Sequence, residues 1–243
     1  MIKTIALDYG GVLAYPVSGN WFIPYNFFKL MGFGTSLKLI FKRSRLNKAF
    51  IKGNEYLLEN HLLFTEDEEY QQFFRFYRIV FAELKMRVAD SVIEKFARDA
   101  VYNDDRVHIY SDVVDEIKKL KEKYRVVILS DTWPSLKRIL KNSGILDLLD
   151  GLVMSCSHGK TKETKEFFEI AVKELDLIPE ECLFIDDSET NLKNAKEAGF
   201  VPVLMNRRSD TSSAEYAIIH NLDEIEAVVE ALEPEDETDD EKS

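Results

Sequence analysis

The sequence predicts an α/β protein with a parallel-sheet core and an inserted all-helical block. After about residue 106, short apolar runs alternate with helix-like segments, which indicates βαβ units with right-handed crossovers. An earlier apolar run, Ile5–Leu7, ends in Asp8 and two glycines, as a buried strand before a tight turn does. Residues 14–105 instead repeat apolar side chains with the period of a helix.

Composition limits the class of protein. A chain of 243 residues suits one large domain or a core with an inserted subdomain, and 45% hydrophobic residues suffice for a real core. The two cysteines, Cys156 and Cys182, have no metal-ligand or disulfide-framework spacing, so a reducing compartment, the cytoplasm, is expected. Lys3 and Asp8 argue against a secretion signal, and no run approaches the ~18 apolar residues of a membrane span.

Charge is distributed unevenly along the chain. The net charge is −12, and residues 233–243 contribute −6 of it through seven acids and one lysine, which predicts a disordered acidic tail. Residues 14–54 carry seven basic residues and no acid. A nucleic-acid patch, attraction of an anionic small substrate and a solvated helix face all fit this segment. The solvated face is the simplest explanation, and no nucleic-acid partner is expected.

Residues 14–105 are expected to form four or five helices. An N-cap residue, Thr65, precedes three acids and predicts the start of one of them. Most aromatic side chains are assigned to a core, whereas Trp21, Phe22 and Tyr25 follow the first strand closely enough to line a pocket. The residues at helical spacing include Phe27, Phe28, Leu30, Met31, Leu37, Ile40, Phe41, Phe73, Phe74, Phe76, Tyr77, Val80, Phe81 and Leu84.

The second half of the chain is expected to supply the rest of the core. The predicted strands are Arg125–Ser130, Leu152–Ser155, Cys182–Asp186, Val201–Leu204 and Tyr216–Ile219. The predicted helices are Asp112–Tyr124, Ser135–Ser143, Lys165–Leu175 and Glu189–Ala198. Gly144 and Gly199 follow two of these helices, as glycines at helix C-termini often do.

Polar side chains stand where the predicted strands end. Asp8 and Ser130 follow or end two strands, Lys162 lies in a loop after a third, and Asp186 and Asp187 end a fourth. Carboxyl ends of parallel strands meet at one edge of a sheet, so these groups are expected in one crevice. Neighbouring carboxylates repel unless a hard cation such as Mg²⁺ binds them. A lysine and a hydroxyl suit a phosphate, and one carboxylate facing it can act as nucleophile.

Simpler explanations exist for each of these residues. Asp8 can accept hydrogen bonds from local backbone, Asp186 and Asp187 can cap the following helix, and Lys162 can be a solvated loop lysine. Two adjacent acids exceed what a cap needs, which favours the metal site.

Four segments stand out in order along the chain. They are Leu7–Leu13, then Ile128–Ser130, then Gly159–Lys162 with Phe168 and Ala171, and then Phe184–Ser188 with Asn191, Ala195 and Gly199. Together they resemble the four motifs of the haloacid dehalogenase-like hydrolase superfamily. The resemblance implies a Rossmann-like core, here residues 1–13 and 106–232, and a helical cap, residues 14–105, inserted between the first two motifs.

The resemblance also implies residue roles and a cofactor, Mg²⁺. Asp8 is the nucleophile and, with the Gly10 carbonyl and Asp187, a ligand of Mg²⁺. Asp186 supports the metal site, either directly or through a bound water molecule. Ser130 holds the transferring phosphoryl group.

The lysine of the third motif is assigned to Lys162, which neutralises charge on the nucleophile and the phosphate. Lys160 and Lys165 are the alternatives for this role. Asp131 and Gly11 join Lys162 as expected substrate-binding residues.

The sequence departs from the family pattern at the position of the general acid. Phosphatases of this type usually carry an acid two residues after the nucleophile, where this chain has Gly10. The loss of a general acid costs ~10²–10⁴-fold in rate, so slow turnover or a preference for good leaving groups is expected. Asp131 and His158 are the candidates for the missing proton donor. Glu163–Thr164 also replaces the usual Pro-Asp after the lysine.

Three hypotheses follow. The leading one is a Mg²⁺-dependent phosphatase that acts on a small phosphorylated metabolite through an aspartyl-phosphate at Asp8. The second is a catalytically impaired relative that binds a phosphorylated ligand or a protein, which Gly10 supports. The third, a 2-haloacid dehalogenase, needs the nucleophile but has little use for so many carboxylates.

Overall fold

The computed structural model describes residues 1–32, 43–207 and 215–232. Within these ranges no helix is both long and apolar enough to cross a bilayer. The predicted acidic tail and part of the predicted helical stripe, Leu37, Ile40 and Phe41, lie outside the described residues.

The strands are β1 (Thr4–Leu7), β2 (Ala14–Pro16), β3 (Val107–Ile109), β4 (Arg125–Ser130), β5 (Gly151–Met154), β6 (Cys182–Asp186), β7 (Val201–Met205) and β8 (Ala217–Ile219). The α-helices are α1 (Phe27–Met31), α3 (Arg43–Glu59), α4 (Glu66–Glu83), α5 (Asp90–Tyr102), α6 (Val113–Leu120), α7 (Leu136–Asn142), α8 (Lys165–Leu175), α9 (Glu189–Glu197) and α10 (Ile225–Leu232).

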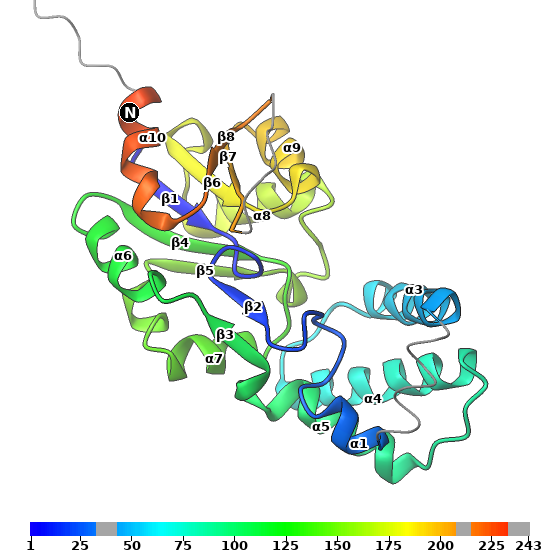
Figure 1. Cartoon of the computed structure of the whole chain (residues 1–243). Helices are drawn as coiled ribbons and strands as arrows, with labels where there is room; N and C mark the ends of the chain where they lie inside the picture. Colours follow the sequence, from blue (N-terminus) through cyan, green and yellow to red (C-terminus); the bar gives the residue numbers. More distant parts are fainter. Residues whose placement is uncertain (33–42, 208–214, 233–243) are drawn as a thin grey trace, which may run out of the picture.

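The predicted parallel sheet is confirmed. Its strand order is β5-β4-β1-β6-β7-β8, and every neighbouring pair is parallel (Figure 1). The first strand of the chain, β1, lies in the interior of the sheet, where all four of its residues are buried. A continuous apolar run is typical of a strand covered on both faces.

Helices cover both faces of this sheet. Alternate side chains of β1 point to opposite faces, so Ile5 and Leu7 join one apolar cluster and Ala6 joins another. The first cluster holds residues of α6, α7 and α10, and the second holds residues of α8 and α9. The core is therefore a three-layer α/β/α structure.

A short antiparallel ribbon joins the core to the helical residues. The sequence analysis placed Ala14–Pro16 in the helical block, but they form β2, which pairs with β3 in the register Tyr15↔His108. These two segments lie more than 90 residues apart in the sequence, so no local pattern indicates their pairing. The ribbon holds both connections to the helical residues in one place.

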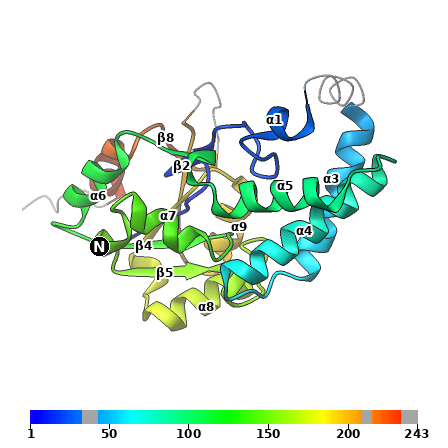
Figure 2. The same cartoon turned by 90° about the horizontal axis from the view of Figure 1, so that it is seen from below.

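The helices α1, α3, α4 and α5 form a separate group beside the sheet, which is called the helical region below (Figure 2). Helix α4 begins as predicted at Thr65, whose side chain accepts a hydrogen bond from the Glu68 N–H, and Glu68 completes a capping box. Its buried face repeats at helical spacing and packs in the aromatic core of the region. That face consists of Phe73, Phe76, Tyr77, Val80 and Phe81.

Polar contacts fasten the helical region to the core. Trp133, in the loop after β4, donates a hydrogen bond from Nε1 to Gln72 Oε1 on α4 at 2.7 Å. The buried carboxylate of Glu69 on α4 accepts hydrogen bonds from the backbone N–H and the hydroxyl of Ser135, both at 2.7 Å. The helical region therefore lies over the loop that follows β4.

Candidate active site

Three neighbouring strands bring the predicted carboxylates and hydroxyl together. Leu7 of β1 lies beside Ile128 of β4 and Ile185 of β6, so the residues that follow emerge at the same edge of the sheet. The Asp8 N–H extends this pattern by donating to the Ile185 carbonyl at 2.9 Å. Ser130 lies at the end of β4. In open α/β sheets, ligands bind outside the carboxyl ends of the strands.

Lys162 is the lysine that reaches this edge. Its side chain is 1% exposed, and Nζ lies 2.7 Å from Asp8 Oδ1 and 2.6 Å from Asp186 Oδ2. The loop is held in place because the Lys162 N–H donates to Asp131 Oδ1 at 2.9 Å. Lys160 is exposed and lies outside the cluster.

The electrostatics of the cluster follow from burial. Burial raises the pKa of Asp8, and the nearby Asp186 and Asp187 raise it further, whereas Lys162 lowers it. Burial alone would lower the pKa of Lys162, but Asp186 and Asp8 outweigh it and hold the amine in its charged form. The site therefore keeps a buried positive charge between two carboxylates.

Asp186 and Asp187 occupy different environments. Asp186 is fully buried, and its oxygens accept hydrogen bonds from Lys162, from the Ser188 N–H at 2.8 Å and from Asn191 Nδ2 at 3.1 and 3.2 Å. Asp187 is exposed. One carboxylate oxygen from each of Asp8, Asp186 and Asp187 lies within 4.8 Å of the others, a group that could hold a metal ion.

Gly11 allows Asp187 to approach Asp8. A Cβ at Gly11 would overlap the Asp187 carboxylate, and the residue has φ = +75°, which favours glycine. The Gly11 N–H donates to the Ala14 carbonyl at 2.8 Å, and the expected role of Gly11 in substrate binding stays a prediction. Gly11 therefore serves the acid cluster through its missing side chain.

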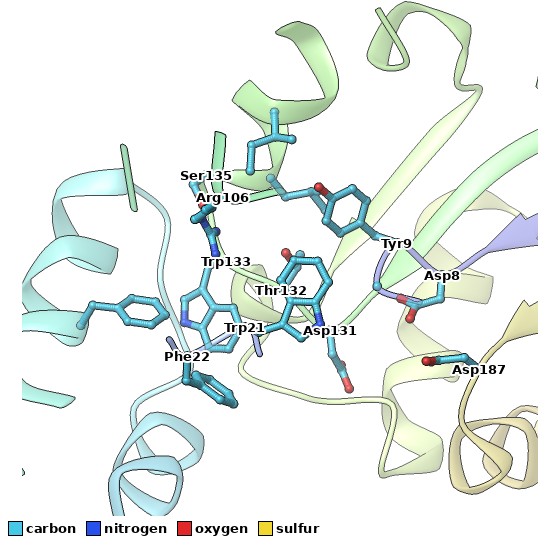
Figure 3. Close-up of a pocket in the computed structure, with 14 residues that line it drawn as sticks. Asp8, Tyr9, Trp21, Phe22, Arg106, Asp131, Thr132, Trp133, Ser135 and Asp187 are labelled. Atoms are coloured by element: carbon cyan, nitrogen blue, oxygen red, sulfur yellow. The ribbon is translucent and has the colours of Figure 1, made fainter. Parts of the chain in front are cut away.

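A cavity of about 300 Å³ opens in front of Asp8 and is called the Asp8 cavity (Figure 3). Asp8, Gly10, Asp131 and Asp187 line it on the core side. Aromatic side chains line it on the side of the helical region, namely Trp21, Phe22, Phe73 and Trp133. Two of the residues expected to line a pocket, Trp21 and Phe22, do so here, whereas Tyr25 lines a separate apolar cavity in the helical region.

Both the sequence and the fold of this chain are similar to those of known proteins. Residues 2–199 match the family described as haloacid dehalogenase-like hydrolase. The chain belongs to this family.

Individual relatives of this hydrolase carry more than one activity. A D-ribitol-5-phosphate phosphatase from Bacteroides thetaiotaomicron is 34% identical over 94 residues, which are 36% of this chain and 46% of that protein. The match therefore spans less than half the length of this curated relative. The HAD-hydrolase YfnB from Bacillus subtilis, solved bound to magnesium, has a TM-score of 0.65 at 18% identity and covers 94% of this chain and 98% of its own. L-2-haloacid dehalogenase from Xanthobacter autotrophicus has a TM-score of 0.67 at 16% identity, with 96% and 100% covered.

Trp21 occupies the space in front of Gly10 in this HAD-like hydrolase. A Cβ built on Gly10 would lie 3.3 Å from Trp21 Cζ2. The position that usually carries an acid in related phosphatases is therefore next to an indole ring.

The two candidate proton donors lie in different places. Asp131 lines the Asp8 cavity, and desolvation by the cavity walls raises its pKa even though the side chain stays open to the cavity. His158 lies outside the cavity and its Nε2 is 2.9 Å from Glu174 Oε2. Of these two candidates, only Asp131 is in reach of a substrate in the cavity.

The sequence analysis missed several residues of this cavity, of which three are used below. Tyr9 directly follows Asp8, Trp133 follows the second motif by three residues, and Arg106 precedes β3 where the chain returns from the helical region. Tyr9 and Trp133 could have been found by their proximity to motifs. Arg106 belongs to no motif, so only the fold brings it to the cavity.

Proposed function

We propose that the protein is a Mg²⁺-dependent phosphatase that hydrolyses a small phosphorylated metabolite through an aspartyl-phosphate at Asp8. The observation that carries this proposal is the buried Lys162 bridge between Asp8 and Asp186, with Asp187 beside it. The bridge presents a carboxylate nucleophile next to a fixed positive charge, as attack on an anionic phosphoryl group requires.

The charge balance supports a bound cation. Three carboxylates surround one lysine, so the ionised cluster carries a net charge of −2. Asp8, Asp187 and the Gly10 carbonyl would hold Mg²⁺, which supplies charge that stabilises the phosphoryl oxygens. A dehalogenase, which transfers no phosphate, has little use for this excess of carboxylates. The phosphatase relative and the magnesium-bound neighbour also favour this assignment.

In the first step, a carboxylate oxygen of Asp8 attacks phosphorus and the ester P–O bond breaks. Lys162 faces Asp8 Oδ1 and stabilises the charge that builds up on the phosphoryl oxygens. Ser130 Oγ is buried and has no hydrogen-bond partner among the described residues, so it is available to donate to a phosphoryl oxygen. Water then cleaves the acyl phosphate and regenerates Asp8.

The departing alcohol oxygen takes its proton from Asp131 in this mechanism. Asp131 lines the same cavity, and burial raises its pKa, which is the direction that suits a general acid. An acidic side chain at Gly10 would meet the Trp21 ring, which would have to shift to make room for it.

The direct test is hydrolysis of a panel of phosphate esters, including an activated aryl phosphate, with Mg²⁺ or with a chelator. Asp8→Asn is expected to abolish turnover while the fold is retained, and beryllium fluoride, which mimics the acyl phosphate, should bind the wild type only. Asp147→Asn, an exposed aspartate outside the cavity, is the matched control and should keep full activity. Full activity in Asp8→Asn would refute the mechanism.

The position of Gly10 separates a catalyst from a binding protein. Because Asp131 has to protonate the leaving group without the usual acid at position 10, Asp131→Asn should slow an alkyl phosphate far more than an aryl phosphate. Gly10→Asp is expected to gain little alone, because the new Cβ would meet Trp21, and to speed alkyl esters when combined with Trp21→Ala. If none of these proteins cleaves an activated ester, the binding role becomes the better explanation.

Two further expectations belong to this proposal. The helical region acts as the substrate cap over the Asp8 cavity, since Phe73 of α4 lines the cavity. The cytoplasm is the proposed compartment, because Cys156 and Cys182 are buried free thiols.

A further inference from the structure

Two residues that line the Asp8 cavity each carry a buried polar atom that the reaction does not use. These atoms are the hydroxyl oxygen of Tyr9 and Nε of Arg106, and neither has a hydrogen-bond partner in residues 1–32, 43–207 and 215–232. Tyr9 is only 5% exposed. Native proteins leave few buried donors unpaired, because an unpaired donor loses its hydrogen bonds to water without replacement. The pair therefore indicates a ligand group at this place.

The acids around Arg106 are engaged elsewhere. Both oxygens of Glu69 accept hydrogen bonds from Ser135, and Asp104 is paired with Arg138. Nε of Arg106 has no hydrogen-bond partner within the described part of the chain. Its charge still acts in the cavity, where it opposes the effect of burial that raises the pKa of Tyr9. The guanidinium therefore lies at the cavity wall with Glu69 and Asp104 near it, but with no direct ion pair to either of them.

The position of Arg106 and the apolar lining of the cavity strengthen the interaction of its positive charge with an anion. In the view of Figure 3, Arg106 lies away from Asp8 and Asp187, and the Tyr9 ring points away from Asp8. The cavity lining also includes apolar side chains, namely Leu136 and Ile139 in addition to the aromatic residues. Hydrogen bonds to charged groups are stronger where water is excluded.

We propose that Arg106 and Tyr9 form a second anion-binding subsite in the Asp8 cavity. Resting on the proposed function, this inference specifies the substrate class: a phosphomonoester whose alcohol carries a second oxyanion, a carboxylate or another phosphate, on a flat or apolar body. Arginine binds either oxyanion through two parallel N–H groups, and a tyrosine hydroxyl adds a third donor. The second oxyanion satisfies both orphaned donors, while the ester phosphate lies against Asp8.

The test compares aryl phosphates that differ only in the second group. The probes are 4-carboxyphenyl phosphate, 3-carboxyphenyl phosphate, 1,4-phenylene bisphosphate and 4-carbamoylphenyl phosphate. The carbamoyl compound is the neutral control, since it has a similar shape and an electron-withdrawing substituent. In the wild type, kcat/KM should favour a charged probe over the carbamoyl probe by roughly tenfold or more, mainly through KM. The carboxylate and bisphosphate arms distinguish the two sources of the oxyanion.

The variants assign this preference to residues. Arg106→Gln should bring the ratio of charged to neutral probe close to one, Arg106→Lys should keep part of it, and Tyr9→Phe should reduce it. Because the Tyr9 hydroxyl has no hydrogen-bond partner among the residues that the structure describes, Tyr9→Phe should keep the wild-type melting temperature and remains informative if Arg106→Gln fails to fold. Arg87→Gln removes an exposed arginine outside the cavity and should leave the ratio unchanged.

Two outcomes would overturn the subsite. One is a wild-type ratio within about twofold of one while Asp8-dependent hydrolysis of all probes is observed, and this result leaves the proposed function intact. The other is a strong preference that Arg106→Gln and Tyr9→Phe both retain.

Binding separates this inference from the proposed function. The chain has two tryptophans, and both line the Asp8 cavity, so quenching of their fluorescence reports occupancy without catalysis. If no ester is hydrolysed, the phosphatase assignment fails. Tighter binding of 4-carboxyphenyl phosphate than of the carbamoyl probe, lost in Arg106→Gln, would still support the subsite, and equal binding would refute it.

Discussion

Replacing Lys162 with methionine removes the positive charge between two buried carboxylates and keeps a side chain of similar length. In the wild type, Nζ lies 2.7 Å from Asp8 and 2.6 Å from Asp186, which are 6% and 0% exposed. Without the lysine, both acids stay buried with no opposite charge between them. We therefore expect Lys162→Met to destabilise the fold as well as to abolish turnover.

The size of the effect can be worked from the geometry. Removing one partner of a buried ion pair costs about 3–5 kcal/mol. The carboxylates of Asp8 and Asp186 have oxygens within 4.8 Å of each other. At an effective dielectric constant of ~20, two charges at this distance repel by about 3.5 kcal/mol, which agrees with the first figure. For a chain of this length, such a loss lowers the melting temperature by roughly 6–20 °C.

The measurement is urea unfolding followed by circular dichroism in the presence of a chelator. Lys160→Met is the matched control, because it removes an exposed lysine from the same loop. The loss of unfolding free energy in Lys162→Met should shrink as the pH falls. The reason is that the buried carboxylates of the folded variant bind a proton more readily than those of the unfolded chain. A loss below about 1 kcal/mol, or an equal loss in the control, would refute the electrostatic role of Lys162.

Two other residues give separate tests. Gly11→Ala should displace Asp187 and raise the Mg²⁺ concentration needed for half-maximal rate. The control is Gly19→Ala, which has φ = +77° and nothing near its added Cβ, so it should carry only the backbone strain. Equal Mg²⁺ dependence in the two variants would contradict this role of Gly11. Burial raises the pKa of Glu69 from 4.5 to about 7, so the folded state holds a proton that the unfolded chain has lost, and stability should fall as the pH rises between these values, by up to about 1.4 kcal/mol per pH unit. Glu69→Gln should flatten that part of the urea-midpoint profile, and an unchanged slope would show that other groups cause it.

The sequence by itself determined the parallel sheet and the identity of the acid cluster. Strand and helix periods are local properties, and they placed β4, β6 and α8 at the residues where the structure has them. The parallel topology then brings the strand-end residues together, because the carboxyl ends of parallel strands lie at the same edge of a sheet. Asp8, Asp186 and Asp187 could be brought together on that basis alone.

The wall of the cavity opposite this cluster was decided only by the tertiary structure. Trp21 stands in front of Gly10 because the chain turns back between β2 and α1, and Arg106 reaches Tyr9 across 96 intervening residues of the chain. Neither placement follows from a period or a motif, since each depends on how the helical region packs on the loop after β4. Local patterns record which side chains are buried, whereas the path of the whole chain fixes which buried side chains meet. The acid cluster is therefore visible in the sequence, and the residues on the opposite wall of the cavity are visible only in the fold.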